Sequence, residues 1–217
     1  IRNPQRNTDM PYQPGELSDA EKAELDSALL GRALHCEFGF EPVNLNTGNF
    51  YLAQEDFSYG DSLGTFALQR SYNSKNPGRA GSFGRGFTSL FDESISARED
   101  GALLYNREDG SSLVFTPEGN GSYKAPEGYQ IKLRRETAGS FQAEFSTGVQ
   151  GYTVYRYVVT KENNSERIFD KDGSLIQTRE ENGETLTLNR DLNGRLTGIT
   201  REGVTMGITA TPEGFIS

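Results

Sequence analysis

Short stretches of alternating apolar and polar residues, separated by glycine-containing turns, dominate the C-terminal third of the chain. Residues 184–188 read Glu-Thr-Leu-Thr-Leu, which is the pattern of a half-buried strand. Acidic-Gly and Asn-Gly pairs recur about every ten residues, the spacing of common β-hairpins. These pairs are Asp172–Gly173, Asn182–Gly183, Asn193–Gly194, Glu202–Gly203 and Glu213–Gly214. The pattern predicts a β-meander built from a repeat, and such repeats normally serve architecture.

The repeat becomes clearer when Gly173, Gly194 and Gly214 are aligned. Asp170 and Asp191 then lie three residues before the glycine, and an apolar residue (Leu175, Leu196 or Ile216) lies two residues after it. The period is about twenty residues, or two strands and two turns. One such unit cannot bury its apolar face alone, so we expect the units to stack on their neighbours.

The middle of the chain, residues 41 to about 150, has dense turn signals and imperfectly alternating strand candidates. The candidates are residues 65–72, 102–106, 112–116 and 152–160. Mixed faces in residues 66–72 predict strands that are bulged or buried on both sides. The expected fold class is therefore all-β.

The first residues differ from the rest and contain the one good helix signal. Ser18 and Glu21 form a capping box, and the helix is expected over about residues 19–30, with Gly31 ending it. A helix this short needs a surface to dock on. We expect a leader over residues 1–37, a β domain over 38–160 and repeats over 161–217.

Composition narrows the possible partners. The formal net charge is −9, and no basic stretch is present, so phosphate-driven nucleic-acid binding is not expected. No apolar run approaches the roughly 20 residues that cross a bilayer, and no signal-peptide core is present. The single cysteine, Cys36, leaves the compartment open. The chain starts without Met and stops just after a turn signal, so we expect it to be a piece of a longer protein.

Two sets of residues resemble the Rhs family of YD-repeat proteins. Phe169-Asp170-Lys-Asp-Gly173-Ser-Leu175 and Arg190-Asp191-Leu-Asn-Gly194-Arg-Leu196 are similar to YD repeats, although Phe169 and Arg190 stand where the family has tyrosine. An ordered set of motif residues is similar to the domain that opens Rhs shells, with Glu41 and Phe87 replacing the usual Asp and Trp. This set comprises Pro42, Val43, Asn44, Thr47, Gly48, Asp56, Tyr72, Asn73, Phe83, Gly84, Arg85, Gly86 and Phe87.

The resemblance covers about residues 38–217 and implies a hollow β-cocoon that encloses a C-terminal toxic domain of a polymorphic toxin. It implies that the chain is the beginning of the wall, secreted or delivered from a bacterial cell through type VI or other routes in interbacterial competition. The implied partners are the remainder of the shell, its cargo and a secretion-system spike or adaptor that contacts the leader. No enzymatic activity and no cofactor are implied for this segment.

Other candidate chemistry has simpler interpretations. Asp170-x-Asp172-Gly173 and Asn189-x-Asp191-x-Asn193-Gly194 resemble part of a calcium loop, but the closing carboxylate is missing, which favours hairpin turns and no metal. His35 and Cys36 are adjacent, so in an extended chain their side chains point to opposite faces. A processing site over residues 34–40 and a glycosidase carboxylate pair stay open, without positioned residues to support them.

An alternative function from another class is surface adhesion or carbohydrate binding by exposed aromatic strands. The absence of Trp weakens this alternative, and most Tyr and Phe residues are expected in the wall. Of the two functions, encapsulation is the one the sequence favours. It predicts an unpaired sheet edge at the C-terminal side of the segment.

Overall fold

The structure is a computed structural model that describes residues 30–31, 38–40, 43–44, 47–61, 64–145, 148–211 and 215–216. The expected helix over residues 19–30, apart from Leu30, lies outside the described residues. So do His35, Cys36, Pro42 and Gly214, and most of the possible processing site over residues 34–40. Among the described residues, no helix is long and apolar enough to span a membrane.

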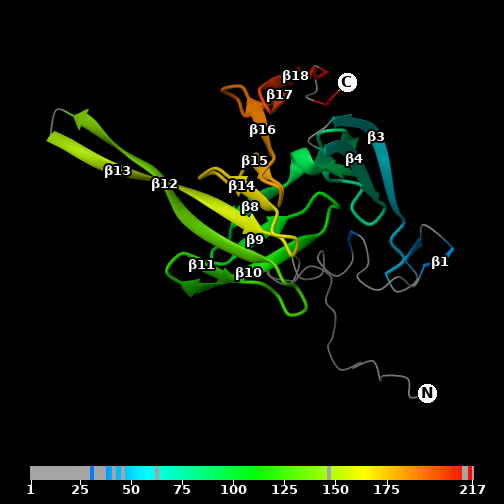
Figure 1. Cartoon of the computed structure of the whole chain (residues 1–217). Coiled ribbons are helices and arrows are strands. Elements are labelled where there is room, and N and C mark those ends of the chain that lie inside the picture. The colour runs from blue at the N-terminus through cyan, green and yellow to red at the C-terminus, as the bar shows by residue number, and fades with distance from the viewer. Residues whose placement is uncertain are drawn as a thin grey trace, which may run out of the picture.

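An antiparallel sheet of eleven strands runs through most of the chain in sequence order, from β8 at one edge to β18 at the other (Figure 1). The all-β fold predicted from the turn pattern is confirmed, and the sheet is continuous across residue 160, where repeats were expected to begin. The strands are β8 (Ser94–Ala97), β9 (Leu103–Asn106), β10 (Ser112–Gly119), β11 (Ser122–Lys124), β12 (Lys132–Phe145), β13 (Gly148–Thr160), β14 (Glu166–Phe169), β15 (Leu175–Arg179), β16 (Thr185–Arg190), β17 (Leu196–Arg201) and β18 (Val204–Gly207).

A second, smaller set of elements precedes this sheet. A three-stranded sheet has the order β3-β4-β7, and two short hairpins and one 3₁₀ turn complete the set. The elements are β1 (Phe38–Phe40), β2 (Val43–Asn44), β3 (Tyr51–Asp61), β4 (Gly64–Asn73), β5 (Ala80–Gly81), β6 (Gly84–Arg85), β7 (Phe87–Ser89) and η1 (Leu90–Asp92). The β3–β4 ladder is bulged on β3, between Glu55 and Phe57, whereas the sequence indicated an irregularity within residues 66–72.

Most turns of the meander share one design. In each, the first residue donates its amide to the carbonyl of the residue four positions later, and the amide three positions on donates back to the first carbonyl. A residue with positive φ at the fourth position makes this a type I turn followed by a G1 bulge. The turns span residues 98–102, 107–111, 161–165, 170–174, 180–184 and 191–195. The repeated Asp-Gly and Asn-Gly pairs thus specify repeated hairpins.

The long sheet curls until its first strand meets one of its own turns. The amide of Ile95 in β8 donates to the carbonyl of Gly173 at 2.8 Å, and Ser94 forms a β-bridge with Ser174. Gly173 has φ +83°, and a Cβ there would overlap the carbonyl oxygen of Ile95. Glycine is therefore required at this turn both for its conformation and for the contact.

The concave face of the curled sheet carries the core. Its buried side chains come from β8 to β17 and include Tyr105, Leu113, Phe115, Leu133, Val159, Phe169, Leu175, Leu186, Leu188 and Ile199. Phe66 and Leu68 of β4, together with Phe83, Leu90 and Phe91, pack against them. The elements that precede β8 therefore fill the space enclosed where the long sheet curls back toward β8.

One hairpin leaves this body. β12 and β13 pair with each other along their whole length, but β11 reaches β12 only at Leu133 and Arg134, and β14 reaches β13 only from Tyr157 onward. The rest of the hairpin extends as a two-stranded arm away from the curled sheet (Figure 1).

Candidate functional site

The family-motif residues that the structure describes gather mainly around β4. The Tyr72 ring lies 6.2 Å from Phe50 and 5.2 Å from Phe87, and Arg70 lies over the Phe87 ring while pairing with Asp56 at 3.0 Å. These contacts connect β3, β4 and β7 through aromatic and cation–π interactions. Asp56 and Phe87 therefore have a physical role together, although they are far apart in the sequence.

Asn73 is the polar centre of this layer. Its side chain, which is 3% exposed, donates to the carbonyl of Asp109 at 2.8 Å and accepts from the Gly31 amide and the Asn49 side chain at 2.9 and 2.8 Å. One buried amide thus joins residue 31, the entry to β3 and the β9–β10 turn. Gly110 must be glycine here, because a Cβ would come within 2.5 Å of the Asn73 amide nitrogen.

Some of the remaining motif residues lie in the turn that leads into β3. Val43 and Asn44 form β2, and the Asn44 side chain accepts from the Thr47 amide at 3.2 Å. Gly48 follows with φ +69°, a conformation that glycine adopts without strain. These residues therefore shape the turn.

The other motif residues lie around the β5–β6 hairpin. Phe83 stacks on Phe91 with ring centroids 6.4 Å apart, whereas Arg85 is exposed. Gly84 in β6 has φ +109°, and Gly86 has φ +80°. A Cβ at Gly86 would meet the Tyr72 ring at 2.6 Å, so this glycine allows the hairpin to approach the aromatic layer.

The repeat residues lie in the hairpin turns between β14 and β17, in the C-terminal part of the long sheet. Asp170 accepts the amides of Asp172 and Ser174, both at 2.9 Å, and Asp191 accepts those of Asn193 and Arg195 at 2.8 and 2.9 Å. In the intervening turn, Asn182 instead accepts the Glu184 amide at 3.0 Å. The aspartate of each YD-like unit thus accepts the amides that shape its own turn. Gly183, Gly194 and Gly203 all have positive φ.

The position before that aspartate takes two forms. Phe169 is fully buried against Tyr105, with ring centroids 5.9 Å apart, whereas Arg190 donates to the carbonyls of Gly194 and Phe91. Burial lowers the pKa of Arg190 below its ordinary value. In the second unit Arg190 therefore connects the long sheet to η1 by a hydrogen bond, whereas Phe169 of the first unit packs in the core.

A buried ionic cluster joins the long sheet to the chain after η1. The Glu93 side chain is 0% exposed, accepts a hydrogen bond from the Tyr105 hydroxyl at 2.9 Å, and lies 3.5 Å from the Lys161 ammonium and 3.8 Å from Arg167 Nε. Burial raises the pKa of Glu93, and Lys161 opposes the shift. Burial and the adjacent Glu93 raise the pKa of Tyr105 well above its ordinary value.

The arginine in this cluster shows the opposite balance. Burial lowers the pKa of Arg167, but Glu93, Glu108, Tyr105 and Glu180 together raise it above its ordinary value. For Glu93 the loss of water dominates, because its second oxygen, Oε1, has only the lysine ion pair and no hydrogen bond within the described residues. The cluster therefore connects the segment after η1 to β9, β14 and Lys161 through one hydrogen bond and two close contacts between acidic and basic groups.

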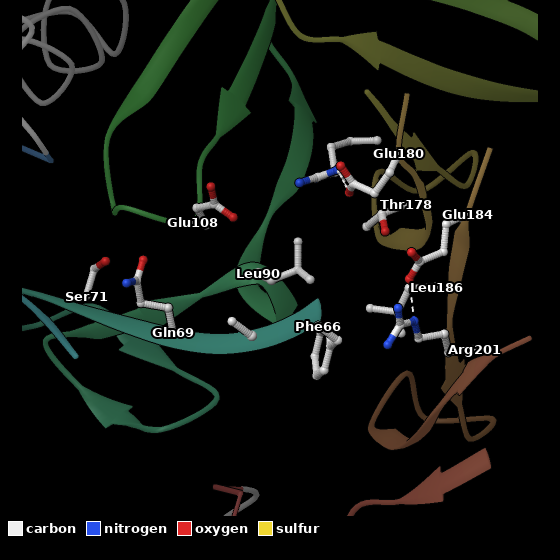
Figure 2. A pocket seen from close by; sticks show the side chains of 12 residues that line it. Phe66, Gln69, Ser71, Leu90, Glu108, Thr178, Glu180, Glu184, Leu186 and Arg201 are labelled. Carbon is white, nitrogen blue, oxygen red and sulfur yellow. Dashed lines mark hydrogen bonds and ion pairs between the residues drawn. The ribbon is translucent and has the colours of Figure 1, made fainter. Parts of the chain in front are cut away.

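A cleft of about 330 Å³ opens beside this cluster, between β4 and strands β15 to β17. Figure 2 shows Phe66, Gln69, Ser71 and Glu108 on one side and Glu180, Glu184 and Arg201 on the other. Arg201 pairs with Glu184, and Arg167 pairs with Glu180 at 3.3 Å. Each arginine of the lining is thus paired with a glutamate that adjoins a neighbouring strand, and the third carboxylate, Glu108, lies 3.5 Å from the Lys161 ammonium.

Sequence reasoning did not find the ionic cluster or the cleft. Glu93 and Arg167 are far apart in the sequence, and neither lies in a motif. Their partners depend on how far the sheet curls, which local periodicity does not encode. One local signal points to the cluster. Arg167 is a charged residue on β14, the short strand that also carries the core residues Ile168 and Phe169.

A known protein family matches part of the chain. Residues 40–115 are similar to a family described as a domain of unknown function (DUF6531). This span begins at the last residue of β1 and ends in β10. It includes Tyr72, Asn73 and their partners other than Gly31, and it excludes the turns at Asp170 and Asp191. No curated protein matches the chain.

Proposed function

We propose that the protein is the opening segment of an Rhs-type shell, a β-wall that encloses a C-terminal toxic domain delivered from a bacterial cell. The observation that carries this proposal is the eleven-stranded meander, which grows strand by strand in one direction and leaves an open edge at β18. Within the described residues, β18 pairs only with β17. Such an edge is a ready template for the next hairpin.

The side chains on β18 support continuation. Val204 is 72% exposed and Met206 is 41% exposed. Large apolar side chains on a sheet edge favour coverage by a further strand over contact with water. The repeat turns that precede β18 supply a design that further units can copy without change.

The opposite end of the strip favours a cap. The space enclosed by the curled sheet is filled by Phe66, Leu68, Phe83 and Leu90. In addition, β8 is hydrogen-bonded to the β14–β15 turn at Gly173. Under this proposal, the segment closes one end of the shell, and the enclosed space begins beyond β18. Its role is steric, and its paired charges stabilise the wall without taking part in a reaction.

The experiment uses a longer protein that contains this chain followed by a separate C-terminal domain. Limited proteolysis should leave that domain intact inside the wild-type protein. Leu188→Asp, which puts a charge into the core of the strip, should open the wall and expose the domain to cleavage. Equal cleavage in the wild type and the variant would contradict the proposal.

Adhesion makes a different prediction for the exposed aromatic residues. Tyr59 and Tyr155 are 50% and 42% exposed, but they lie on separate sheets, in β3 and β13. Saturable glycan binding that is lost in Tyr59→Ala or Tyr155→Ala would favour adhesion. The encapsulation proposal predicts no such binding.

A further inference from the structure

The β12–β13 arm exposes two long strand edges. Beyond its base, β13 from Gly148 to Arg156 has hydrogen-bonded register only with β12, and β12 from Glu136 to Phe145 has register only with β13. Two-stranded ribbons are marginally stable alone in water. Two long, unpaired edges therefore make this arm an available pairing surface.

The two edges differ in charge. Between Gly148 and Tyr155, β13 carries no charged residue and no proline, although 24% of the whole chain is charged. Natural edge strands usually carry lysine, proline or inward charges that prevent pairing. The outer edge of β13 has none of these over that stretch.

Self-pairing distinguishes the two edges further. If β12 paired with its own copy antiparallel about residue 140, Glu136 of each copy would lie opposite Glu144 of the other. Directly opposed like charges destabilise strand pairs. If β13 paired about Tyr152, uncharged residues would oppose each other from Val149 to Tyr155.

The position of the arm allows a second copy to be the occupant. Each copy has a net charge of −9, which opposes close approach of the bodies. The arm extends away from the curled sheet, so joined arms would keep the acidic bodies apart (Figure 1). Antiparallel pairing of identical edges closes a two-fold dimer, which satisfies both copies at once.

We propose that the outer edge of β13, residues 148–156, pairs antiparallel with the same edge of a second copy and joins two arms into a four-stranded sheet. This proposal does not depend on the container function. The pairing also differs from any contact through β18, because the two edges lie at different places in the sheet.

The test compares matched pairs of lysine substitutions on the two edges of the same arm. Gly151 and Thr153 are exposed on β13, and Gly151 has open space where a Cβ would stand. Antiparallel pairing about Tyr152 places position 151 of one copy opposite position 153 of the other. The lysines of G151K/T153K would therefore face each other, and this variant should lose the dimer. T137K/S140K places two charges on the exposed outer edge of β12 and serves as the control.

The measurement is sedimentation velocity over about two decades of protein concentration, where association must follow mass action. The wild type and T137K/S140K should dimerise with the same concentration dependence, whereas G151K/T153K should stay monomeric with unchanged circular dichroism. A wild type that is monomeric throughout would overturn the proposal. So would a dimer that both lysine pairs weaken equally, or one that only the β18 variant Val204→Lys dissociates.

A cross-link tests the register independently. Tyr152→Cys in a Cys36→Ser background should form a disulfide-linked dimer on mild oxidation, because residues paired at a two-fold axis bring their Cα atoms within disulfide range. Ser140→Cys in the same background should form far less. Equal cross-linking of the two variants would contradict pairing through β13.

Discussion

At the scale of single residues, the repeat glycines have different roles although the sequence makes them look alike. Gly173 and Gly194 stand at the same position of the two YD-like units and have φ +83° and +78°. A Cβ at Gly173 would overlap the Ile95 carbonyl, whereas a Cβ at Gly194 would meet nothing within 4 Å. Only Gly173 therefore allows the curled sheet to close against β8.

This difference gives a matched pair of variants. Gly194→Ala should cost about 1 kcal/mol, because alanine is strained at positive φ. Gly173→Ala carries the same strain and must also displace β8, which adds roughly 1 to 3 kcal/mol. Urea unfolding measures both, and equal losses of stability would contradict the proposed fastening.

Asn73 supports a second prediction at this scale. Asn73→Ala removes three buried hydrogen bonds and leaves the Asp109 carbonyl and the Gly31 amide without this partner, so it should cost about 2 to 4 kcal/mol. Asn76→Ala is the control, because no side-chain hydrogen bond of Asn76 occurs within the described residues; its effect should be within about 0.5 kcal/mol. Thermal unfolding compares them, and similar midpoints would refute the role of Asn73 as the centre of the layer.

Glu93 gives a pH-dependent prediction. Its folded pKa is raised above the ordinary 4.5, so its contribution to stability is greatest below pH 4.5 and is lost as the pH rises through the folded pKa. Glu93→Gln cannot ionise and lacks this loss. The stability of the wild type relative to Glu93→Gln, measured by urea unfolding, should therefore fall as the pH rises above about 4.5 and through the folded pKa of Glu93. A relative stability that rises over this range would show that Lys161 and Arg167 outweigh burial.

At the scale of elements, the sequence was informative wherever local turn chemistry decides the structure. The turns at Asp172–Gly173, Asn182–Gly183 and Asn193–Gly194 were readable because Asp, Asn and Gly favour the conformations that they adopt. The strands could then be assigned to the alternating segments between these turns. Of the arm, the sequence predicted part of β13, as residues 152–160. It did not predict β12, which lacks alternation over Thr137–Ser140, where the ladder is bulged.

The ionic cluster and the cleft depend on contacts between distant elements. Glu93 meets Lys161 and Arg167 only after β8 has turned back onto the β14–β15 turn. Arg190 reaches Phe91 across 99 positions for the same reason. Local periodicity predicts which strands form, but the degree of curl arises from core packing along the whole sheet.

At the scale of the whole molecule, the fold is a strip with two unlike ends. At β8 the strip turns back and is fastened, and its interior is filled by the N-terminal elements. At β18 the edge is open and carries exposed apolar side chains. This polarity is what an end cap that is continued by further repeats requires, and it is the physical basis of the proposed function.

The most direct test of continuation is hydrogen exchange at Val204–Gly207. We expect the outward-facing amides of β18 to exchange rapidly in this segment alone and to become strongly protected in a longer protein that contains it, because the next strand pairs with them. Protection in the β14–β15 hairpin should be the same in both. Equally rapid exchange at β18 in the longer protein would mean that no strand follows, and would contradict the wall that the repeats are proposed to build.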